Sequence, residues 1–443
     1  DGQSRAELLP KMFGEEIIQA FREFKRLWDP QGKMNPGKVV DPYRQTDNLR
    51  LGPDYNPPQP ETHFRYPTDK GSWSRAILRC VGIGACRNHG GQTMCPSYMV
   101  TREEEHSTRG RARLLWEMMN GDVIEDGWKS EEVKNALDLC LSCKGCKHDC
   151  PVNVDMATYK AEFLSHYYQG KMRPRHAFAF GFIQLTSVLA SKVPALANLF
   201  TQAPILRNIA KFLAGMEPKR SIPPFAPQSF KDWFRRRKPR NVGRQTVLLF
   251  ADTFNNYYKP ETAKAAVEVL EDAGFHVHVP LADMCCGRPL YDYGFLPTAK
   301  RWARDFMSKL QGDMERGLPM VVLEPSCAAV FRDELTNLFP QMKLAQKFQT
   351  QTFLLSEFLV KFAPEYKLPQ LHRKALVHGH CHHKALMQMD DENKVLTGMG
   401  LEFREPEDGC CGMAGAFGYE RGDHYRLSID VGERVLLPEV RQA

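Results

Sequence analysis

The sequence lacks any uninterrupted apolar run of the roughly eighteen residues that a membrane-spanning helix requires. Its longest apolar stretch runs from Phe178 to Phe200 and is interrupted by Gln184, Ser187, Ser191, Lys192 and Pro194. The chain also lacks a secretory signal peptide. We therefore expect this stretch to form a helical connector that is buried or faces a partner, with shallow membrane contact as the alternative.

A strong charge of either sign is absent as well. The formal net charge is +7 over 443 residues, and the densest basic run extends from Arg235 to Arg240. We interpret this run as a solvated linker, the alternative being a site for an acidic partner or a lipid surface. The charge also prompts a rival hypothesis, a zinc-stabilised nucleic-acid module. No interleaved aromatic and basic motif of that kind is present, so we expect no nucleic-acid partner.

Cysteine, in contrast, is abundant. Thirteen cysteines in a long chain without a signal peptide do not fit a disulfide framework, which is typical of short secreted proteins. Clustered thiols in such a chain more often bind metal. The length also exceeds what one hydrophobic core supports and predicts two or three domains.

The beginning of the chain has the pattern of an amphipathic helix. Apolar residues recur at helical spacing from Gly14 onward, and Asp29 with Pro30 ends the run. A proline-rich stretch that begins at Leu51 reads as a linker. Because the chain begins without methionine, we interpret it as a fragment of something longer or a processed product. Residues 1 to 45 would then belong to a domain whose body lies elsewhere.

From Thr246 the pattern changes to alternating strands and helices. Short strands are predicted over 246–252, 275–280, 320–327 and 374–381. The segment from Glu261 is predicted to be a helix with Gly274 as its C-cap. This alternation favours a parallel sheet with right-handed crossovers.

The same region contains a diverged repeat. The segment VPLADMCCGRPLYDYG around Cys285 and Cys286 parallels REPEDGCCGMAGAFG around Cys410 and Cys411. Two copies related by pseudo-symmetry would place both cysteine pairs at the carboxyl ends of the strands, where open α/β sheets bind ligands.

A denser cysteine run lies earlier in the chain, with C-x2-C-x2-C-x3-C spacing followed by Pro151. Zinc ribbons instead use two separated C-x2-C pairs. The run has the spacing of a bacterial ferredoxin, in which three thiolates hold one [4Fe–4S] cluster and the fourth reaches the other cluster. The four cysteines are Cys140, Cys143, Cys146 and Cys150.

A related run before Pro96 has one thiol fewer, because Ile83 occupies the position of the missing cysteine. The crossover predicts two ligand sets: Cys95, Cys140, Cys143 and Cys146 for one cluster, and Cys80, Cys86 and Cys150 for the other. The second cluster would be three-iron or labile, or would take His89 as a fourth ligand. The simpler interpretation of His89 is a polar loop residue. Iron–sulfur subunits similar to those of succinate dehydrogenase and fumarate reductase have an aliphatic residue here, and this resemblance implies a [3Fe–4S] centre.

Six more cysteines lie in the C-terminal half: Cys285, Cys286, Cys327, Cys381, Cys410 and Cys411. Adjacent cysteines rarely form a disulfide with each other because the geometry is strained. They suit two thiolates that reach neighbouring irons, and the glycine permits a close backbone approach. The pattern resembles the CCG domains of heterodisulfide reductase, anaerobic glycerol-3-phosphate dehydrogenase and lactate-utilisation proteins, which implies that these cysteines hold metal.

The pattern departs from its fullest form in both halves. The first half lacks a counterpart of Cys381, and the second lacks a counterpart of Cys327. A single shared cluster, or a thiol site, fits six cysteines better than one cluster per half. The alternative is that these cysteines are structural and pack in the core as small apolar side chains. The histidines between His378 and Lys384 are expected to hydrogen-bond to the cluster or cap the following helix rather than to bind metal.

Taken together, the motifs resemble the C-terminal part of a fused bacterial FAD/iron–sulfur D-2-hydroxyacid dehydrogenase. The segment FREFKRLWDPQGKMNPGKVVDP is similar to the exit of a vanillyl-alcohol-oxidase type FAD domain, and the cysteine motifs follow in the family's order. The resemblance implies an α+β multidomain fold. Its expected parts are an FAD-oxidase tail (1–45), a Pro-rich linker (46–72), a helical two-cluster ferredoxin-like domain (73–170), a helical and basic connector (171–240) and two pseudo-symmetric α/β CCG lobes (241–345 and 346–443).

This resemblance implies that FAD, in an upstream domain, oxidises D-2-hydroxyglutarate or D-lactate to the 2-oxo acid. The clusters here would pass electrons to a quinone, a cytochrome or a soluble carrier. We assign no catalytic acid or base and no FAD ligand in this chain. We expect a cytoplasmic homo-oligomer, with peripheral contact at the inner face of the membrane as the alternative.

Two redox alternatives remain open. One is a thiol/disulfide reductase of the heterodisulfide reductase type, with the CCG cysteines as its catalytic centre. The other is the iron–sulfur subunit of an anaerobic glycerol-3-phosphate dehydrogenase.

Overall fold

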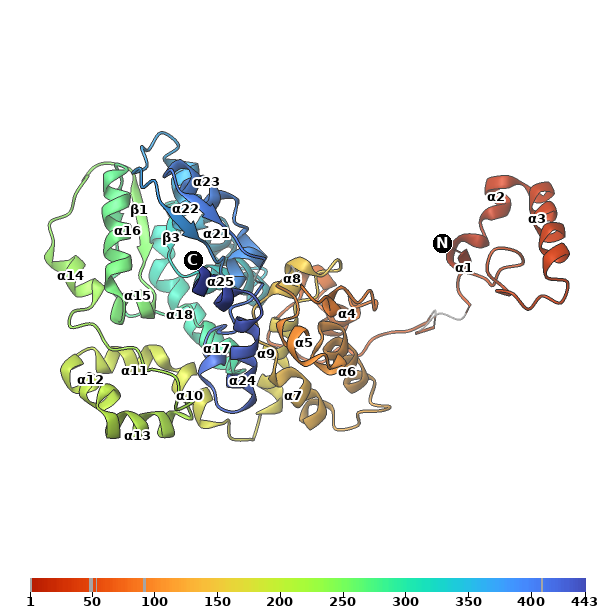
Figure 1. Cartoon of the computed structure of the whole chain (residues 1–443), viewed down its shortest axis with the longest axis horizontal. Helices are drawn as coiled ribbons and strands as arrows, with labels where there is room; N and C mark the ends of the chain where they lie inside the picture. Colours follow the sequence, from red (N-terminus) through yellow and green to blue (C-terminus); the bar gives the residue numbers. More distant parts are fainter. Residues whose placement is uncertain (1, 48–50, 53, 91–92, 408) are drawn as a thin grey trace. The chain divides into compact units, whose positions relative to one another are not determined.

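The structure is a computed structural model that describes residues 2–47, 51–52, 54–90, 93–407 and 409–443. The chain divides into two compact units, Asp1–Pro58 and Gln59–Ala443 (Figure 1). Part of the expected proline-rich linker, and part of the loop that follows His89, lie outside the described residues.

In its described residues the first unit has the helices α1 (Gly2–Ala6), α2 (Leu9–Phe13) and α3 (Glu15–Trp28). The amphipathic helix predicted from Gly14 onward is therefore confirmed. Asp29 ends α3, because its carboxylate accepts the backbone N–H groups of Lys33 and Met34 and pairs with Lys25 at 2.7 Å. Ile18 is the buried residue of α3, and the apolar residues Ile17, Phe21, Phe24, Leu27 and Trp28 of the same helix are exposed.

The second unit begins with short helices that carry the ferredoxin-like cysteines. They are η1 (Pro67–Asp69), α4 (Trp73–Leu78), η2 (Ala85–Arg87), α5 (Pro96–Thr101), η3 (Glu104–His106), α6 (Thr108–Asn120), η4 (Gly127–Lys129), α7 (Glu131–Asp138), α8 (Gly145–Asp149) and α9 (Met156–Tyr167). Ser107 and Ser130 start α6 and α7 with side-chain caps to the third residue along, as N-cap serines commonly do. Cysteines lie both in the loops between these helices and in the helices themselves, with Cys86 in η2 and Cys146 in α8.

The connector expected over 171–240 consists of separate short helices rather than one long one. They are α10 (Arg175–Gly181), α11 (Ile183–Ala190), α12 (Pro194–Gln202), α13 (Pro204–Ala214) and α14 (Phe230–Arg236). Pro194 and Pro204 each begin a helix, since proline is tolerated only in the first turn. In the part of the chain that the structure describes, no helix is long and apolar enough to cross a membrane.

The first CCG region is built on a parallel sheet in the order β2-β1-β3-β4. Its elements are β1 (Thr246–Phe250), α15 (Thr253–Tyr257), α16 (Pro260–Asp272), β2 (His276–His278), α17 (Arg288–Asp292), α18 (Leu296–Glu315), β3 (Met320–Val322), α19 (Pro325–Ala329), η5 (Val330–Glu334), α20 (Leu335–Leu338), α21 (Lys343–Gln351), β4 (Thr352–Phe353) and α22 (Leu355–Phe362). The parallel sheet is confirmed, and β4 extends it past residue 345. Gly274, with φ of +93°, follows the last helical turn and ends it.

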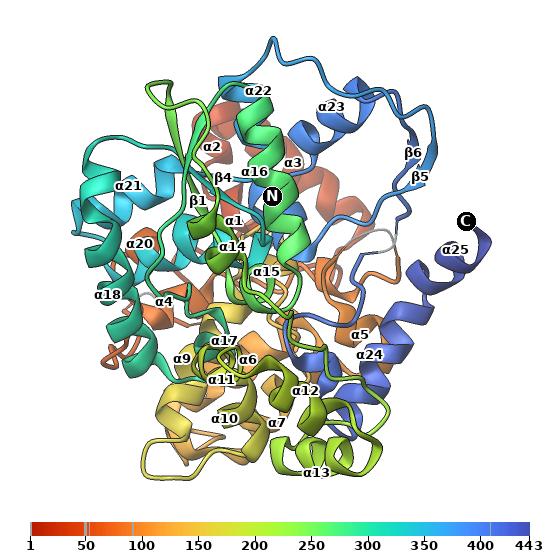
Figure 2. The same cartoon turned by 90° about the vertical axis from the view of Figure 1, so that its left-hand side faces the viewer.

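A smaller sheet follows, in which β5 and β6 pair in parallel. Its elements are β5 (Lys374–Leu376), η6 (His383–Met387), α23 (Asp390–Gly398), β6 (Glu402–Arg404), η7 (Phe417–Tyr419), α24 (Asp423–Glu433) and α25 (Leu436–Gln442). The second unit is thus a mixed, helix-rich α/β body, as expected for the fold class (Figure 2).

One hydrophobic core joins the cysteine-bearing helices to the first sheet. It contains Trp73, Leu115 and Phe163 on one side and Phe306 and Phe331 on the other. Alternate residues of β1 face opposite ways: Leu248 and Phe250 lie in this core, whereas Val247 and Leu249 lie in a second core beneath α14 and α16. Because the two cysteine regions share a core, their relative position is fixed by packing.

Candidate metal centres

The structure brings together the four cysteines predicted for the first cluster. Cys95 directly precedes α5, Cys140 and Cys143 lie in the loop after α7, and Cys146 lies in α8. All four are buried and free of disulfides, and together they line one small cavity. Burial raises the pKa of the Cys143 and Cys146 thiols well above the usual value, and neighbouring groups raise it further. Four convergent buried thiols with no partner among themselves form a donor set that fits a [4Fe–4S] cluster.

A buried guanidinium stands against one of these thiols. Arg111 donates from Nη1 to Cys95 Sγ at 3.3 Å and from Nη2 to Ser97 Oγ at 2.9 Å, and it donates from Nε to the carbonyl of Ala136. Burial by itself would raise the pKa of Cys95, but Arg111 and the surrounding hydrogen-bond donors bring it below its usual value. A cysteine held as thiolate is the form that binds iron.

The three cysteines predicted for the second cluster lie in or against the same core. Cys86 is buried in η2 and accepts the backbone N–H of Arg109 at 3.3 Å, whereas Cys80 and Cys150 are half-buried. Burial raises the pKa of the Cys86 thiol, and Cys95 and Cys80 add to this effect. Arg79, next to Cys80, donates to the carbonyl of Asn153 at 3.3 Å and so links the two cysteine runs.

Ile83 lies between two glycines that both have φ of +83°, and 59% of its surface is exposed. An exposed turn of this kind accepts isoleucine without any packing requirement. The ring of His89 is also exposed and lies 6.1 Å from that of Tyr98, centroid to centroid. Whether the second cluster is three-iron, labile or completed by His89 therefore stays a prediction.

The first CCG motif forms a compact group of thiols. Cys286 Sγ lies 3.0 Å from Cys327 Sγ. The pKa values of both thiols are raised, and that of Cys327 reaches about 12. The hydrogen bond with Cys286 by itself would lower the pKa of Cys327, but burial and the nearby carboxylates Asp252 and Glu324 outweigh it. Cys285 and Cys286 do not lie at the end of β2 but several residues beyond it, and Cys327 lies in α19 rather than in a strand.

The second CCG motif has a matching local geometry. The N–H of Gly412 donates to Cys410 Sγ at 3.4 Å, and the N–H of Gly287 donates to Cys285 Sγ at the same distance. Both glycines have positive φ, +78° and +86°, which favours glycine over other residues. In each copy the glycine thus turns the chain back onto the first cysteine of the pair.

Cys143 connects this second motif to the ferredoxin-like site. It lies in one apolar cluster with Cys381 and Cys410, while also lining the cavity of the four cysteines described above. The bond from Cys410, and then that from His378, lowers the pKa of Cys411 to about 4 despite burial. The sequence places Cys143 and Cys381 far apart, so only the fold makes them neighbours.

One of the histidines around Cys381, His380, lies next to residues of the first CCG region. His380 Nε2 lies 3.9 Å from the carboxylate of Glu324, and His380 lines a cavity with Cys285, Cys286 and Cys327. Within the described residues, both ring nitrogens of the buried His382 have no hydrogen-bond partner. Buried polar groups are nearly always paired, so these orphaned nitrogens fit a bound group that offers a donor or acceptor, such as a cluster sulfide.

A buried charge network fixes the loop that carries Cys143. Lys144 is 1% exposed and lies 3.0 Å from Asp155, 2.5 Å from Asp333 and 3.0 Å from Glu334. Arg288, the residue after the first Cys-Cys-Gly, pairs with Glu334 at 2.5 Å and donates to the carbonyl of Ser142 at 2.9 Å. The residues on both sides of Cys143 are thus held by the CCG region. Sequence reasoning missed this network, although Lys144 directly follows Cys143 and Arg288 directly follows the first Cys-Cys-Gly.

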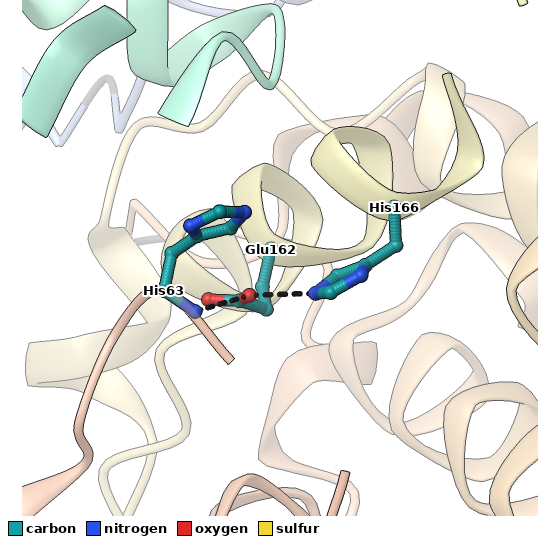
Figure 3. A group of neighbouring side chains, drawn as sticks. All are labelled: His63, Glu162 and His166. Atoms are coloured by element: carbon teal, nitrogen blue, oxygen red, sulfur yellow. Dashed lines mark hydrogen bonds and ion pairs between the residues drawn. The ribbon is translucent and has the colours of Figure 1, made fainter. Parts of the chain in front are cut away.

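A separate group of His63, Glu162 and His166 also brings metal-binding side chains together (Figure 3). The carboxylate of Glu162 accepts the backbone N–H groups of His63 and Phe64 at 2.7 and 2.9 Å and bonds His166 Nε2 at 3.0 Å. Both oxygens of the Glu162 carboxylate therefore already take part in hydrogen bonds. The group is best explained as a structural contact that holds residues 63–64 against α9.

Family comparisons agree with this order of parts. The model for the FAD linked oxidases, C-terminal domain, matches residues 1–39, that for the 4Fe-4S dicluster domain matches 76–154, and that for the cysteine-rich CCG domain matches 250–332. No solved structure matches the chain. The fold and its thiols thus define an iron–sulfur protein with a dicluster region and CCG motifs.

The curated relatives are more specific. The chain is 26% identical to D-2-hydroxyglutarate dehydrogenase of Escherichia coli and 26% identical to that of Pseudomonas putida, over 95% and 94% of its length, and it spans 45% of each relative. It is 30% identical to lactate utilization protein A of Bacillus velezensis over 44% of this chain and 84% of that protein. The chain belongs to the family of lactate utilization protein A, and over nearly all of its length it is similar to the D-2-hydroxyglutarate dehydrogenases. The matched domain families indicate iron–sulfur clusters and FAD as cofactors.

Proposed function

We propose that this chain is the electron-transfer portion of a flavin-dependent D-2-hydroxyacid dehydrogenase that oxidises D-2-hydroxyglutarate or D-lactate to the 2-oxo acid. The observation that carries the proposal is the position of Cys143, which lines the four-cysteine cavity and also lies beside Cys381 and Cys410. Redox groups bound at these two sites would be neighbours in a water-poor interior. Clusters exchange single electrons, which allows the two-electron oxidation of a hydroxy acid at a flavin to be passed on in two steps.

The flavin would be held by a domain upstream of the first unit. The exposed apolar face of α3, which includes Phe24, Leu27 and Trp28, supports this, since an unpaired amphipathic helix in a soluble domain normally packs on a core. The match of residues 1–39 to the C-terminal domain of FAD-linked oxidases supports the same arrangement.

In this proposal Cys95, Cys140, Cys143 and Cys146 hold one [4Fe–4S] cluster, and Cys80, Cys86 and Cys150 hold a cluster that lacks a fourth cysteine because of Ile83. The six CCG cysteines hold further iron. The N–H of Gly287 donates to Cys285 and the N–H of Gly412 donates to Cys410, and this equivalence of the two motifs supports two lobes related by pseudo-symmetry. The residues of this chain orient the thiols, exclude water and fix the distance between sites, and they supply no catalytic acid or base.

The test is Cys143→Ser in the anaerobically purified holoprotein. One four-iron EPR signal and the reduction of the acceptor should be lost, while the bleaching of flavin absorbance by substrate should persist. Ser142→Ala is the matched control, because the contact of Ser142 with Arg288 uses its backbone carbonyl. Loss of flavin reduction in Cys143→Ser, with an intact control, would contradict a relay role.

A thiol/disulfide reductase is a second candidate, because a cavity of about 330 Å³ gives a small substrate access to Cys285, Cys286 and Cys327. That function predicts turnover of a disulfide substrate by the reduced protein without any hydroxy acid. Our proposal for the dehydrogenase also includes a cytoplasmic location, a homo-oligomeric state and contact with a membrane surface.

A further inference from the structure

Helices α11 to α13 expose an unusual amount of apolar surface. Between 42% and 78% of each side chain is exposed for Leu185, Leu189, Val193, Leu196, Leu199, Phe200, Ile205, Ile209, Phe212 and Leu213. Figures 1 and 2 both place these helices along one edge of the second unit. Soluble domains rarely expose so many large apolar side chains on neighbouring helices, and such patches mark contact with a partner or a membrane.

The charges of this segment favour an anionic surface as that partner. Between Glu162 and Glu217 the sequence has no acidic residue. Lys211 is buried and donates to the carbonyl of Pro218, and Arg173 donates to the carbonyls of Tyr293 and Gly294, so the exposed bases of this segment are Lys171, Arg175 and Lys192. An apolar helical face without acids and with flanking bases is the pattern of helices that lie in the interface of an anionic membrane. A second copy of this chain would bring the same bases against one another.

A cavity of about 330 Å³ lies between this connector and the first CCG motif. Phe180, Ile183 and Met216 of the connector form one wall, and Cys285 and Cys327 belong to the other. Its lining is mainly apolar, and its volume is within the range of small-molecule sites. A protein carrier such as a cytochrome could not enter it.

The cavity also contains two carboxyl groups close to the thiols, Asp252 and Glu324. Glu324 lies beside His380, and Asp252 is buried at the start of α15. A larger cavity of about 490 Å³ beside Cys140 is lined by Lys134, Asp138 and Glu420 among others, and suits an apolar ring less well.

From these features we propose that α11 to α13 bind an anionic membrane surface and that the apolar part of the cavity, lined by Phe180, Ile183 and Met216 and next to the iron held by the CCG cysteines, takes a lipid-soluble quinone as the electron acceptor. The inference rests on the proposed dehydrogenase function, which supplies two electrons from the C2–H bond of the hydroxy acid. Each quinone carbonyl oxygen takes up one electron and one proton, so the quinone leaves as quinol. The two protons come from solvent water, and Asp252 and Glu324 are the carboxyl groups that line the cavity.

Membrane binding is tested by flotation of the holoprotein with vesicles of phosphatidylglycerol and phosphatidylcholine, and with vesicles of phosphatidylcholine alone. The wild type should float with the anionic vesicles. Leu189→Glu/Leu196→Glu/Ile205→Glu should lower the bound fraction at least about tenfold, because three exposed apolar contacts are replaced by charges. The matched control, Val123→Glu/Val242→Glu/Val440→Glu, makes the same charge change at exposed sites elsewhere and should float like the wild type.

An absence of flotation, or equal loss in both triple variants, would overturn the membrane assignment. A lipid-free dimer that dissociates only in the connector variant would also overturn it, by showing that a second copy covers the face.

Quinone binding is tested by equilibrium dialysis with decylubiquinone. Ile183→Trp, which fills the cavity, should weaken binding at least tenfold, and Ala416→Leu serves as a second filling variant if the first misfolds. Leu185→Trp makes a similar change on the outer face of the same helix and should bind like the wild type. Unchanged affinity in both filling variants would refute the quinone site.

The dehydrogenase proposal and the proposal of a quinone and membrane site can be refuted separately. If D-2-hydroxy acids do not reduce the holoprotein but decylubiquinone and anionic vesicles bind as described, the dehydrogenase proposal fails and the acceptor site stands. If the hydroxy acid reduces the clusters but neither quinone nor vesicles bind, the acceptor inference alone fails.

Discussion

Replacing Lys144 by methionine should destabilise the second unit strongly, although Lys144 itself binds no iron. Its ammonium is 1% exposed and lies within 3.0 Å of the carboxylates of Asp155, Asp333 and Glu334. Removing one partner of a buried ion pair leaves uncompensated charge and typically costs about 3–5 kcal/mol. Lys147, which is partly exposed, and Arg288 remain to neutralise the carboxylates, so we expect a loss in unfolding free energy at the lower end of this range.

The loss should depend on pH in a defined direction. Burial would raise the pKa of Asp155 and Asp333, but Lys144 and then Lys147 outweigh it and lower both pKa values below the usual one. A carboxylate with a lowered pKa adds stability that is complete above its unfolded pKa, about 4, and is lost as the pH falls. The difference between wild type and Lys144→Met should therefore be full at neutral pH and narrow below about pH 4.

The assay is urea unfolding of the anaerobic holoprotein, followed by tryptophan fluorescence at neutral and acidic pH. Lys394→Met is the control, because Lys394 pairs with Asp391 at the surface and should change the midpoint little. A change below about 1 kcal/mol for Lys144→Met at neutral pH, or a difference that widens on acidification, would refute the reasoning.

Two further predictions concern the cysteine loops. Gly412→Ala should lower the urea midpoint and the iron content, since the added Cβ would lie 2.2 Å from the carbonyl oxygen of Ser428 at φ of +78°; Gly422→Ala, at φ of +72° with open space around it, is the control and should keep its iron. Ile83→Cys should leave stability unchanged, because Ile83 is mostly exposed, and should raise the iron count of the second cluster to that of an ordinary four-iron centre; an unchanged count and EPR spectrum would contradict the crossover assignment.

The sequence by itself determined which domains and cysteine motifs the chain contains and their order along it. Helix α3 of the first unit follows from its apolar spacing, and the strands β1, β2, β3 and β5 each lie within a segment that the alternation of strands and helices predicts. The cysteine motifs indicated their chemistry because cluster ligation requires thiols at fixed short spacings. Cys140, Cys143 and Cys146 lie within a few residues of one another, so local spacing alone makes them candidates for one site.

The tertiary structure decided which residues far apart in the sequence become neighbours, because spacing along the chain does not encode this. Cys143 meets Cys381 and Cys410 because a shared core and the Lys144 and Arg288 contacts pack the two regions together. Such long-range neighbours depend on the sum of many side-chain contacts, and no local pattern specifies them. The same holds for the cavity between the connector and Cys285. The exposed face of α11 to α13 likewise required the fold, because an apolar stretch in sequence reads equally well as buried until its packing is known.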